Sequence, residues 1–340
     1  MTRRVLLLLF AVLLLGGVAT TAVLNASANA GQREHQQAGG PAVRSGSLTL
    51  RPPSGRELVF RNMTWGPYRD DLVTVPADRP DAPRTASGVK CLRFYAASGT
   101  GACLQAEHGT LGDSYQAVIL DARLRELHRF PLAGIPTRAR VSPDGRLTAW
   151  TVFVGGDSYA GTDFSTRTSI VDTRTWKLDD NLETFTIIKD GHPYRASDIN
   201  VWGVTFADDD RFYATVATGG QTYLVQGSLS ARTLTTLHQN VECPSLSPDG
   251  TRIAYKKRVP GASPDAPWRL YVLDLRTMTE TATAEHRNPD DQAVWSDDST
   301  LVYALPGDYG TDLWTVPADG TGAARLLTKA ALAPAYLQAN

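Results

Sequence analysis

The strongest constraint on the fold of this chain is a four-residue turn motif that recurs along the sequence. Two copies are complete, Ser142-Pro143-Asp144-Gly145 and Ser247-Pro248-Asp249-Gly250, and each stands between two short apolar-rich runs. Proline presets φ at the second turn position, aspartate can hydrogen-bond its own backbone, and glycine accepts a positive φ. Each copy therefore predicts a β-hairpin with a short, rigid loop.

Degraded copies of the same motif extend the pattern over most of the chain. They begin at Ala97, Ala207 and Ser296. The copies are spaced by roughly 40 to 65 residues, the range of a propeller blade with variable loops. No helical periodicity is visible between Leu48 and Thr328. We therefore expect an all-β fold, a single β-propeller of six four-stranded blades.

The chain divides around this domain. We expect residues 47–330 to form the propeller, residues 31–46 to form a polar, glycine-rich and flexible stem, and residues 331–340 to form a C-terminal tail. Two ways to close the ring remain open. Residues 47–50 either supply the inner strand of the first blade or pair with the last blade.

Residues 1–30 have the pattern of an export signal. Arg3 and Arg4 precede an apolar run, and Ala28-Asn29-Ala30 offers small residues at a cleavage site. We expect cleavage after Ala30, with an uncleaved signal anchor as the alternative because the apolar run is long. Both place the propeller outside the cytoplasm, either secreted or anchored to the outer face of the cytoplasmic membrane.

The turn copies and their flanking strands resemble the WD40-like (PD40) propeller repeat of the TolB family. The segment 241–257, together with Asp290-Asp291-Gln292, is similar to exported TolB-like propellers of actinobacteria. The resemblance implies a non-catalytic scaffold that binds a protein or peptide partner in the cell envelope. No pattern here matches the helical N-terminal domain of TolB itself, so the resemblance does not extend to a role in the Tol–Pal complex.

The net charge of the chain bears on the partners that we expect. The net charge is −1, which gives no reason to expect nucleic acid or an anionic membrane surface as a partner. We expect membrane contact through the N-terminal segment alone, and a monomer.

The usual catalytic and metal-binding patterns are missing from the sequence. The string nearest to a serine-hydrolase elbow, Gly156-Asp157-Ser158-Tyr159-Ala160, lacks the second glycine. The histidines are scattered, with no i, i+4 pair and no cysteine partner. We therefore expect no catalytic residue and no cofactor, with calcium as the one exception considered below.

The residues that open each inner strand are expected to line the mouth of the central channel. These funnel candidates, the predicted partner-binding residues, are Asp198, Trp202, Glu242, Asp290, Asp291 and Gln292. Converging carboxylates are costly unless they are hydrated, paired with cations or bound to a metal. We favour a water-filled channel with Arg195 or Lys256 as counterions. The alternative is calcium, which six-bladed lactonase-like propellers hold at this place; it would make the chain a calcium-dependent lactonase or related hydrolase.

A second candidate surface comes from a repeated loop string. Gly112-Asp113-Ser114-Tyr115 is echoed at residues 156–159 and loosely at residues 307–310. Hairpin chemistry alone explains the repeat. The functional hypothesis is that these loops present Tyr115, Tyr159 and Tyr309 to a partner on one face, and exposed aromatic rings would also suit a carbohydrate.

The three cysteines suit an exported protein if two of them are paired. Cys91 and Cys103 stand on either side of the degraded turn at residues 97–100, where a cross-strand disulfide is geometrically plausible. Cys243 would then be a buried free thiol. Three free buried thiols are the alternative.

Overall fold

The computed structural model describes residue 20 and residues 40–109, 112–161 and 164–339 of the 340-residue chain. The predicted cleavage site at Ala28 and Ala30, and most of the predicted stem, lie outside the described residues. Within the described part, no helix is long and apolar enough to cross a membrane.

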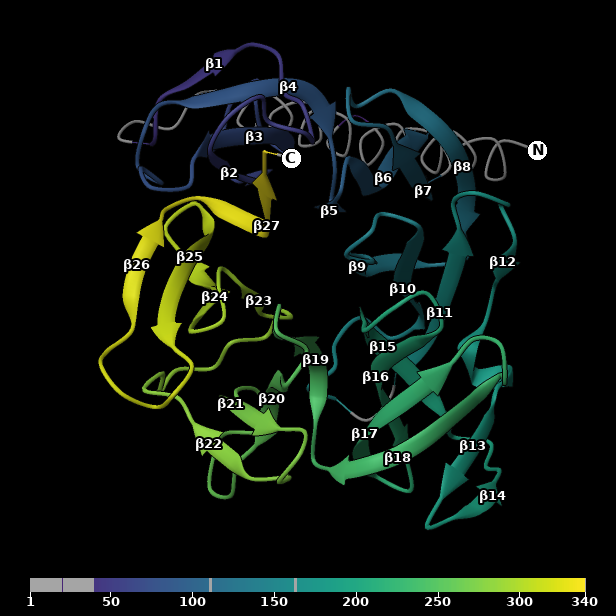
Figure 1. Ribbon diagram of the computed structural model, residues 1–340. Helices are drawn as coiled ribbons and strands as arrows, with labels where there is room; N and C mark the ends of the chain where they lie inside the picture. The colour runs from purple at the N-terminus through teal and green to yellow at the C-terminus, as the bar shows by residue number, and fades with distance from the viewer. Residues whose placement is uncertain (1–19, 21–39, 110–111, 162–163, 340) are drawn as a thin grey trace, which may run out of the picture.

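Six β-sheets stand around a central channel, so the prediction of a six-bladed all-β propeller is confirmed (Figure 1). The strands of each blade are given from the channel outward. Blade 1 contains β27 (Ala331–Gln338), β2 (Arg56–Asn62), β3 (Asp71–Pro76), β4 (Arg84–Lys90) and β1 (Val43–Ser45). Blade 2 contains β5 (Arg93–Ala97), β6 (Thr100–Gly109), β7 (Gly112–Leu120) and β8 (Glu126–Leu132), and blade 3 contains β9 (Ile135–Val141), β10 (Leu147–Gly155), β11 (Ser165–Asp172) and β12 (Leu178–Asp179).

The other three blades complete the ring. Blade 4 contains β15 (Asn200–Phe206), β16 (Arg211–Thr218), β17 (Gln221–Ser228), β18 (Thr233–Gln239), β13 (Thr186–Lys189) and β14 (His192–Tyr194). Blade 5 contains β19 (Glu242–Leu246), β20 (Arg252–Arg258), β21 (Trp268–Asp274) and β22 (Glu280–Ala282). Blade 6 contains β23 (Val294–Trp295), β24 (Thr300–Gly307), β25 (Gly310–Pro317) and β26 (Arg325–Thr328). Leu182–Thr184 form a single 3-10 turn, η1, and the short strand β12 is the outer strand of blade 3.

The ring closes in a way that neither sequence alternative anticipated. Residues 331–338, which the sequence placed in a C-terminal tail, form β27, and β27 pairs antiparallel with β2 as the inner strand of blade 1. Residues 47–50 form no strand, and Leu48 and Leu50 pack into the core instead. One blade thus contains strands from both ends of the propeller.

The repeated turn motif folds as its residues predict. Ser142 Oγ donates to Asp144 Oδ1 (2.6 Å) and accepts from the backbone N–H of Leu147 (2.8 Å), while Asp144 Oδ1 accepts from the N–H of Arg146 (3.0 Å). Gly145 has a φ of 81°, which favours glycine. The copy at residues 247–252 makes the same set of contacts.

The arginines that follow these turns join neighbouring blades. Arg146 Nη1 contacts Asp209 Oδ2 at 2.6 Å, in the degraded turn of blade 4. Arg252 Nη2 donates to the carbonyl of Asp298 at 2.6 Å, in the degraded turn of blade 6. The copies in blades 4 and 6 have therefore lost proline and glycine but still receive these contacts, through the side chain of Asp209 and the backbone of Asp298.

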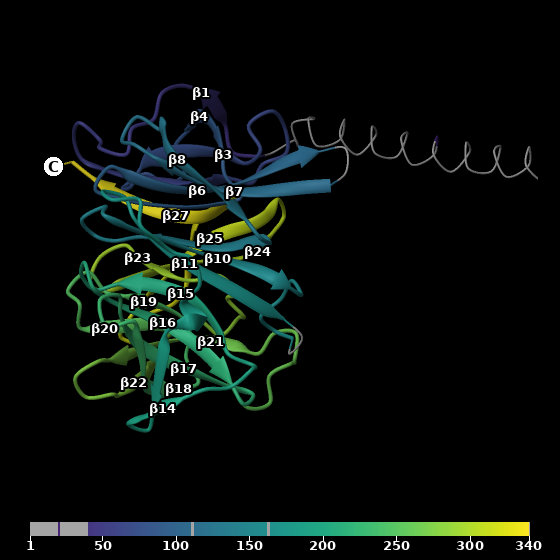
Figure 2. The same cartoon turned by 90° about the vertical axis from the view of Figure 1, so that its right-hand side faces the viewer.

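These turns define the two faces of the ring. We call the face that carries the turns between the inner and second strands the lower face. The opposite face, here called the upper face, carries the connections between blades and the hairpins from second to third strand. One of these hairpins, β6–β7, projects beyond the ring on the right-hand side of Figure 2, which is therefore the upper face. Between adjacent blades the sheets pack through buried apolar side chains, as Phe60 of blade 1 does with Val302 and Leu313 of blade 6.

The sulfur atoms of Cys91 and Cys103 are bonded, with a Cα–Cα distance of 5.3 Å. Cys91 precedes β5, and the register partner of Cys103 on that strand is Phe94. The bridge therefore ties the connection between blades 1 and 2 to β6, rather than two facing positions of one hairpin. Cys243 is a buried free thiol in β19.

Candidate functional site

A network of ion pairs fills the channel below its upper mouth. Arg93 of β5 and Arg138 of β9 converge on the carboxylate of Asp291, with N–O distances of 3.0 and 3.2 Å. Lys256 of β20 reaches the side chain of Asp290 at 3.1 Å and its carbonyl at 2.6 Å. The two aspartates precede β23, where the chain enters blade 6. The channel is therefore paired with cations, as the sequence favoured, with Lys256 but not Arg195 among them.

The charge state of Asp291 follows from these contacts. Burial alone raises the pKa of this carboxyl, but Arg93 and Arg138 more than compensate and lower the pKa below its ordinary value. Asp291 is thus ionised at neutral pH and is held in place by the two arginines. Its role in the channel is structural.

Gln292 joins two neighbouring inner strands beside this network. Its side-chain amide nitrogen donates to the carbonyl of Pro244 (2.5 Å) and lies 3.3 Å from the carbonyls of Gly203 and Val204. These carbonyls belong to bulged segments of β15 and β19. Gly203 has a φ of 69°, and a Cβ there would lie 2.8 Å from the Cα of Cys243, so the close approach of the two strands requires glycine.

Calcium does not fit this arrangement. Cationic side chains outnumber carboxylates in the region: they are Arg93, Arg138, Arg140, Lys256 and Arg258, against Asp198, Asp290, Asp291 and Glu242. Calcium takes 6 to 8 oxygen ligands, roughly, and prefers free carboxylates. Here Asp290, Asp291 and Glu242 are already paired with arginine or lysine, which leaves Asp198 as a single carboxylate without a cationic partner in the part of the chain that the structure describes. In the described residues, no group of three or more His, Cys, Asp or Glu side chains could hold a metal.

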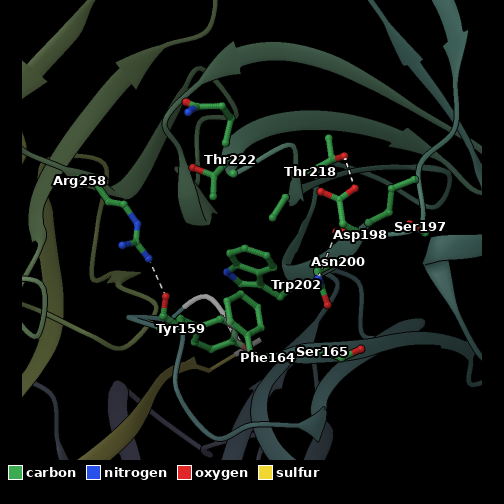
Figure 3. A pocket seen from close by; sticks show the side chains of 15 residues that line it. Tyr159, Phe164, Ser165, Ser197, Asp198, Asn200, Trp202, Thr218, Thr222 and Arg258 are labelled. Carbon is green, nitrogen blue, oxygen red and sulfur yellow. Dashed lines mark hydrogen bonds between the residues drawn. The ribbon is translucent and has the colours of Figure 1, made fainter.

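A pocket of about 400 Å³ opens on the upper face, between blades 3, 4 and 5. Its walls are Tyr159, Gly161 and Phe164 from the described part of the β10–β11 connection, the residues that precede β15, the β16–β17 hairpin and the end of β20 (Figure 3). We call this cavity the upper pocket. It brings together two of the funnel candidates, Asp198 and Trp202.

One wall of the upper pocket is aromatic. The ring of Tyr159 stacks on that of Trp202 with a centroid distance of 5.1 Å, and Phe164 meets Trp202 edge-on at 5.5 Å. The hydroxyl groups of Tyr159 and Thr137 lie 2.8 Å apart in a hydrogen bond that fixes the tyrosine. These rings come from two different blades, so the wall exists only in the assembled ring.

A carboxylate stands on one side of the pocket. Asp198 is exposed, and its two oxygens accept from the N–H of Gly219 (2.6 Å) and the hydroxyl of Thr218 (2.8 Å). These two hydrogen bonds lower the pKa of Asp198 below its ordinary value. The carboxylate is therefore ionised and fixed in orientation, yet open to solvent.

A guanidinium group stands on the other side (Figure 3). Arg258 Nε donates to Glu242 Oε1 at 2.7 Å, and Nη2 donates to the carbonyl of Tyr159 at 2.6 Å. The guanidinium carbon also lies 5.3 Å from the ring centre of Trp268. Glu242 is fully buried whereas the Arg258 side chain is 38% exposed, so a buried carboxylate orients a cation that faces the pocket.

Several buried polar atoms near this corner have no hydrogen-bond partner in the described part of the chain. They are the indole nitrogens of Trp202 and Trp268, Oε2 of Glu242 and Nε of Arg138. Buried polar groups in native proteins are usually hydrogen-bonded to protein atoms or to ordered water. Arg56, Asp71, Thr148 and Trp314 hold four more such atoms elsewhere in the ring, so these atoms do not by themselves mark a site.

The funnel candidates thus separate into two layers. Asp198 and Trp202 line the upper pocket, with Glu242 directly behind Arg258, while Asp290, Asp291 and Gln292 belong to the network below. Arg258 itself was missed. It ends β20, two positions after Lys256, and side chains at alternate positions of a strand share a face, which is the signal that would have found it.

The predicted tyrosine face does not exist as such. Tyr159 and Tyr309 are 3% and 9% exposed, because their rings pack inward against the core, and Tyr115 lies half-buried within β7 rather than in a loop. Of the three, only Tyr159 takes part in the upper pocket, as a structural wall. A surface that presents three tyrosines to one partner is therefore excluded.

A second cavity, of about 290 Å³, lies at the lower mouth. It is lined largely by turn backbone and apolar side chains, including Pro143, Pro248 and Phe206. Arg140 is the one charged residue in its wall. The upper pocket, with charges of both signs, is the better candidate for specific recognition.

Comparisons with known proteins show the fold. No family model matches the chain, and no curated protein matches it. The structure is similar to that of TolB from Acinetobacter baumannii, with a TM-score of 0.54 and 17% identity over 84% of this chain and 67% of that one. It is also similar to a puromycin-hydrolyzing peptidase from Mycobacterium tuberculosis, with a TM-score of 0.51 and 16% identity over 83% of this chain and 45% of the peptidase. This chain therefore spans less than half the length of that peptidase. The protein is a six-bladed β-propeller that is similar in structure to TolB.

Proposed function

We propose that this protein is a non-catalytic, exported propeller that binds a protein or peptide partner in the cell envelope through its upper pocket. The upper pocket carries the proposal. It combines an aromatic wall, an exposed ionised aspartate and an oriented arginine. Pockets of roughly 300 to 1,000 Å³ with an apolar wall and a few placed polar groups are typical ligand sites.

The side chains around the pocket favour binding over turnover. A nucleophile or general base needs a free, positioned group that can change its protonation or bonding state. Here Glu242 and Asp291 are tied to arginines, and burial raises the pKa of Tyr159 well above its ordinary value. Asp198 is held ionised by two hydrogen bonds. These groups fix geometry and charge, as recognition requires.

The location in the envelope rests on the N-terminal sequence, where two arginines, an apolar run and a small-residue cleavage site follow one another. The resemblance of the turn repeats to TolB-like propellers supports the same placement.

The proposal is tested with a substitution that fills the upper pocket with a large side chain and leaves the ion pairs of Arg258 and of the channel unchanged. Thr222, half-buried in β17, lines the upper pocket, whereas Thr235 is an exposed residue of β18 in the same blade. Thr222→Trp should block the pocket, and Thr235→Trp is the matched control. Full-length protein is purified from its own cells under native conditions, and co-purifying proteins and peptides are identified by mass spectrometry.

We expect a specific companion with the wild type and with Thr235→Trp, and its loss with Thr222→Trp. Loss with both variants, or with neither, would place binding elsewhere on the ring. Equal melting temperatures of the two variants confirm that the comparison reports binding rather than folding.

A further inference from the structure

The two charges of the upper pocket stand on opposite sides of it. Figure 3 shows Asp198 and Arg258 across the cavity from each other, with Trp202 between them. A ligand that spans the pocket therefore meets a negative group at one end and a positive group at the other. The chemical identity of that ligand follows from what each end can bind.

The Asp198 end suits a primary ammonium. An ionised carboxylate offers about four lone-pair sites, and the protein occupies two of them, through Thr218 and Gly219. The remaining sites of this exposed group are free to accept. Because both existing bonds are short and come from the same hairpin, the carboxylate is already oriented before a ligand arrives.

The Arg258 end suits a carboxylate. Glu242 holds Nε and the carbonyl of Tyr159 holds Nη2, while Nη1 donates to no group among the described residues. Guanidinium is permanently charged and matches the planar geometry of a carboxylate. The stacking on Trp268 and the pairing with Glu242 remove most of the rotamer freedom that an exposed arginine would otherwise lose on binding.

The middle of the pocket suits an apolar or aromatic body. Between the charged ends lie the half-buried ring of Phe164 and the methyl group of Ala217, together with Trp202, which is only 1% exposed, and the hydroxyl group of Thr222 stands at the edge. A volume of about 400 Å³ is near the lower limit of ligand pockets. It has room for a few residues of an extended chain, not for a folded domain.

We propose that the upper pocket binds short peptides that are free at both ends, with the peptide ammonium at Asp198, its carboxylate at Arg258 and an apolar side chain against the aromatic wall. This inference rests on the proposed function, since it names the ligand of the same pocket. It goes further in one respect: the recognised features are the two chain ends, so neither an internal segment of a protein nor a capped peptide satisfies the site.

The probe is the tripeptide alanyl-phenylalanyl-alanine in four forms: free, N-acetylated, C-amidated and doubly capped. Binding to the full-length protein is measured by isothermal titration calorimetry. The free form should bind best, and we expect each single cap to weaken binding about two- to fivefold, because it removes one charge–charge contact that is partly exposed to solvent.

Two variants assign each end. In Asp198→Asn, N-acetylation should no longer weaken binding, whereas C-amidation still does. Arg258→Lys keeps a cation beside the buried Glu242 but loses the planar fork, and it should reduce the penalty of C-amidation without affecting that of N-acetylation. This pattern of coupling between a variant and a cap is one that general destabilisation would not produce.

The chain supplies a matched control for each variant. Asp319 accepts hydrogen bonds from the N–H and hydroxyl of Thr321, as Asp198 does from its neighbours, but it lies in a turn outside the pocket. Arg287 is paired with buried Glu285 and stacked on Trp314 at 3.8 Å, as Arg258 is on Trp268, and it does not line the pocket. Asp319→Asn and Arg287→Lys should leave all four affinities unchanged.

Three outcomes would overturn the inference. They are no binding of the free tripeptide, equal binding of all four forms, and cap penalties that the pocket variants do not alter. If capped peptides bind as well as free ones and Thr222→Trp abolishes both, the pocket binds internal peptide segments. In that case the proposed function survives and the inference about chain ends fails.

Discussion

At the scale of single residues, the turn aspartates show how far sequence reasoning reaches. Asp249 accepts hydrogen bonds from the hydroxyl of Ser247 and from both the N–H and the hydroxyl of Thr251. Local chemistry of this kind acts within a few residues, so the sequence predicted it correctly. The bond from Arg252 to the next blade depends on how two blades meet, and no local pattern encodes it.

Replacing Asp249 should therefore cost stability in a pH-dependent way. The hydrogen bonds from Ser247 and Thr251 hold the pKa of Asp249 well below its ordinary value. A lowered pKa means that the ionised form stabilises the fold above pH ~4 and that this contribution is lost as the pH falls through the lowered value. Asp249→Ala should lower the free energy of unfolding by about 1 kcal/mol at pH 7.

Urea unfolding of the wild type and Asp249→Ala between pH 7 and pH 2.5 checks this. The gap between the two proteins should be constant down to about pH 4 and should shrink below it. Exposed Asp81 supplies the control, and Asp81→Ala should match the wild type throughout. A gap that widens towards low pH would contradict the account.

At the scale of elements, strands were easier to predict than their closure into a ring. Apolar runs beside turn motifs marked most strands of the blades. Strand β27 escaped because its sequence, Ala-Leu-Ala-Pro-Ala-Tyr-Leu-Gln, contains a proline and follows no turn copy. Its partner β2 stands at the opposite end of the propeller sequence, and such pairing is decided by tertiary packing rather than by local preference.

A buried arginine holds this closure. Arg84 of β4 is fully buried and donates to Asn62 Oδ1 (2.6 Å), to the carbonyl of Ala330 (2.9 Å) and to Thr328 Oγ1 (3.2 Å). Burial lowers its pKa to about 10, so it remains charged at neutral pH. It thereby connects the N-terminal strands of blade 1 to the segment between β26 and β27.

We predict that Arg84→Met lowers the free energy of unfolding by at least about 2 kcal/mol, because several buried acceptors lose their donor at once. Hydrogen exchange should show that the added opening is concentrated in β27 and β2. Arg44→Met, on the exposed strand β1, is the control and should change neither quantity. A uniform rise in exchange over all six blades would argue against a closure specific to Arg84.

At the scale of the whole molecule, the ring brings distant residues to one mouth. That residues at the start of inner strands would lie along the channel was predictable from propeller geometry, and Asp198 and Trp202 do share the upper pocket, while Asp291 lies with Arg93 and Arg138. The split into a pocket above and an ion-pair network below was not predictable. This split depends on the bulges at Gly203 and Cys243. It also depends on how β5, β9 and β20 of different blades are placed relative to one another, because that placement decides which carboxylate each arginine or lysine reaches.

The same network makes a prediction about metal. Because lysine and arginine already neutralise Asp290 and Asp291, added calcium gains no free ligand set. Millimolar calcium and EDTA should both leave the melting temperature of the full-length protein unchanged, since only specific binding shifts it. A calcium-dependent rise with bound metal would contradict the description of the channel as cation-paired.

The central claim is that binding occurs at the upper pocket, and site-specific photo-crosslinking in living cells tests it most directly. A photoreactive residue replaces Gln221, which is exposed on the pocket rim, or Thr277, which is exposed in the β21–β22 turn of the lower face. We predict a discrete adduct from position 221 that disappears when Thr222→Trp is added, and none from position 277. An adduct from position 277 alone, or one at position 221 that the filled pocket does not affect, would contradict the claim.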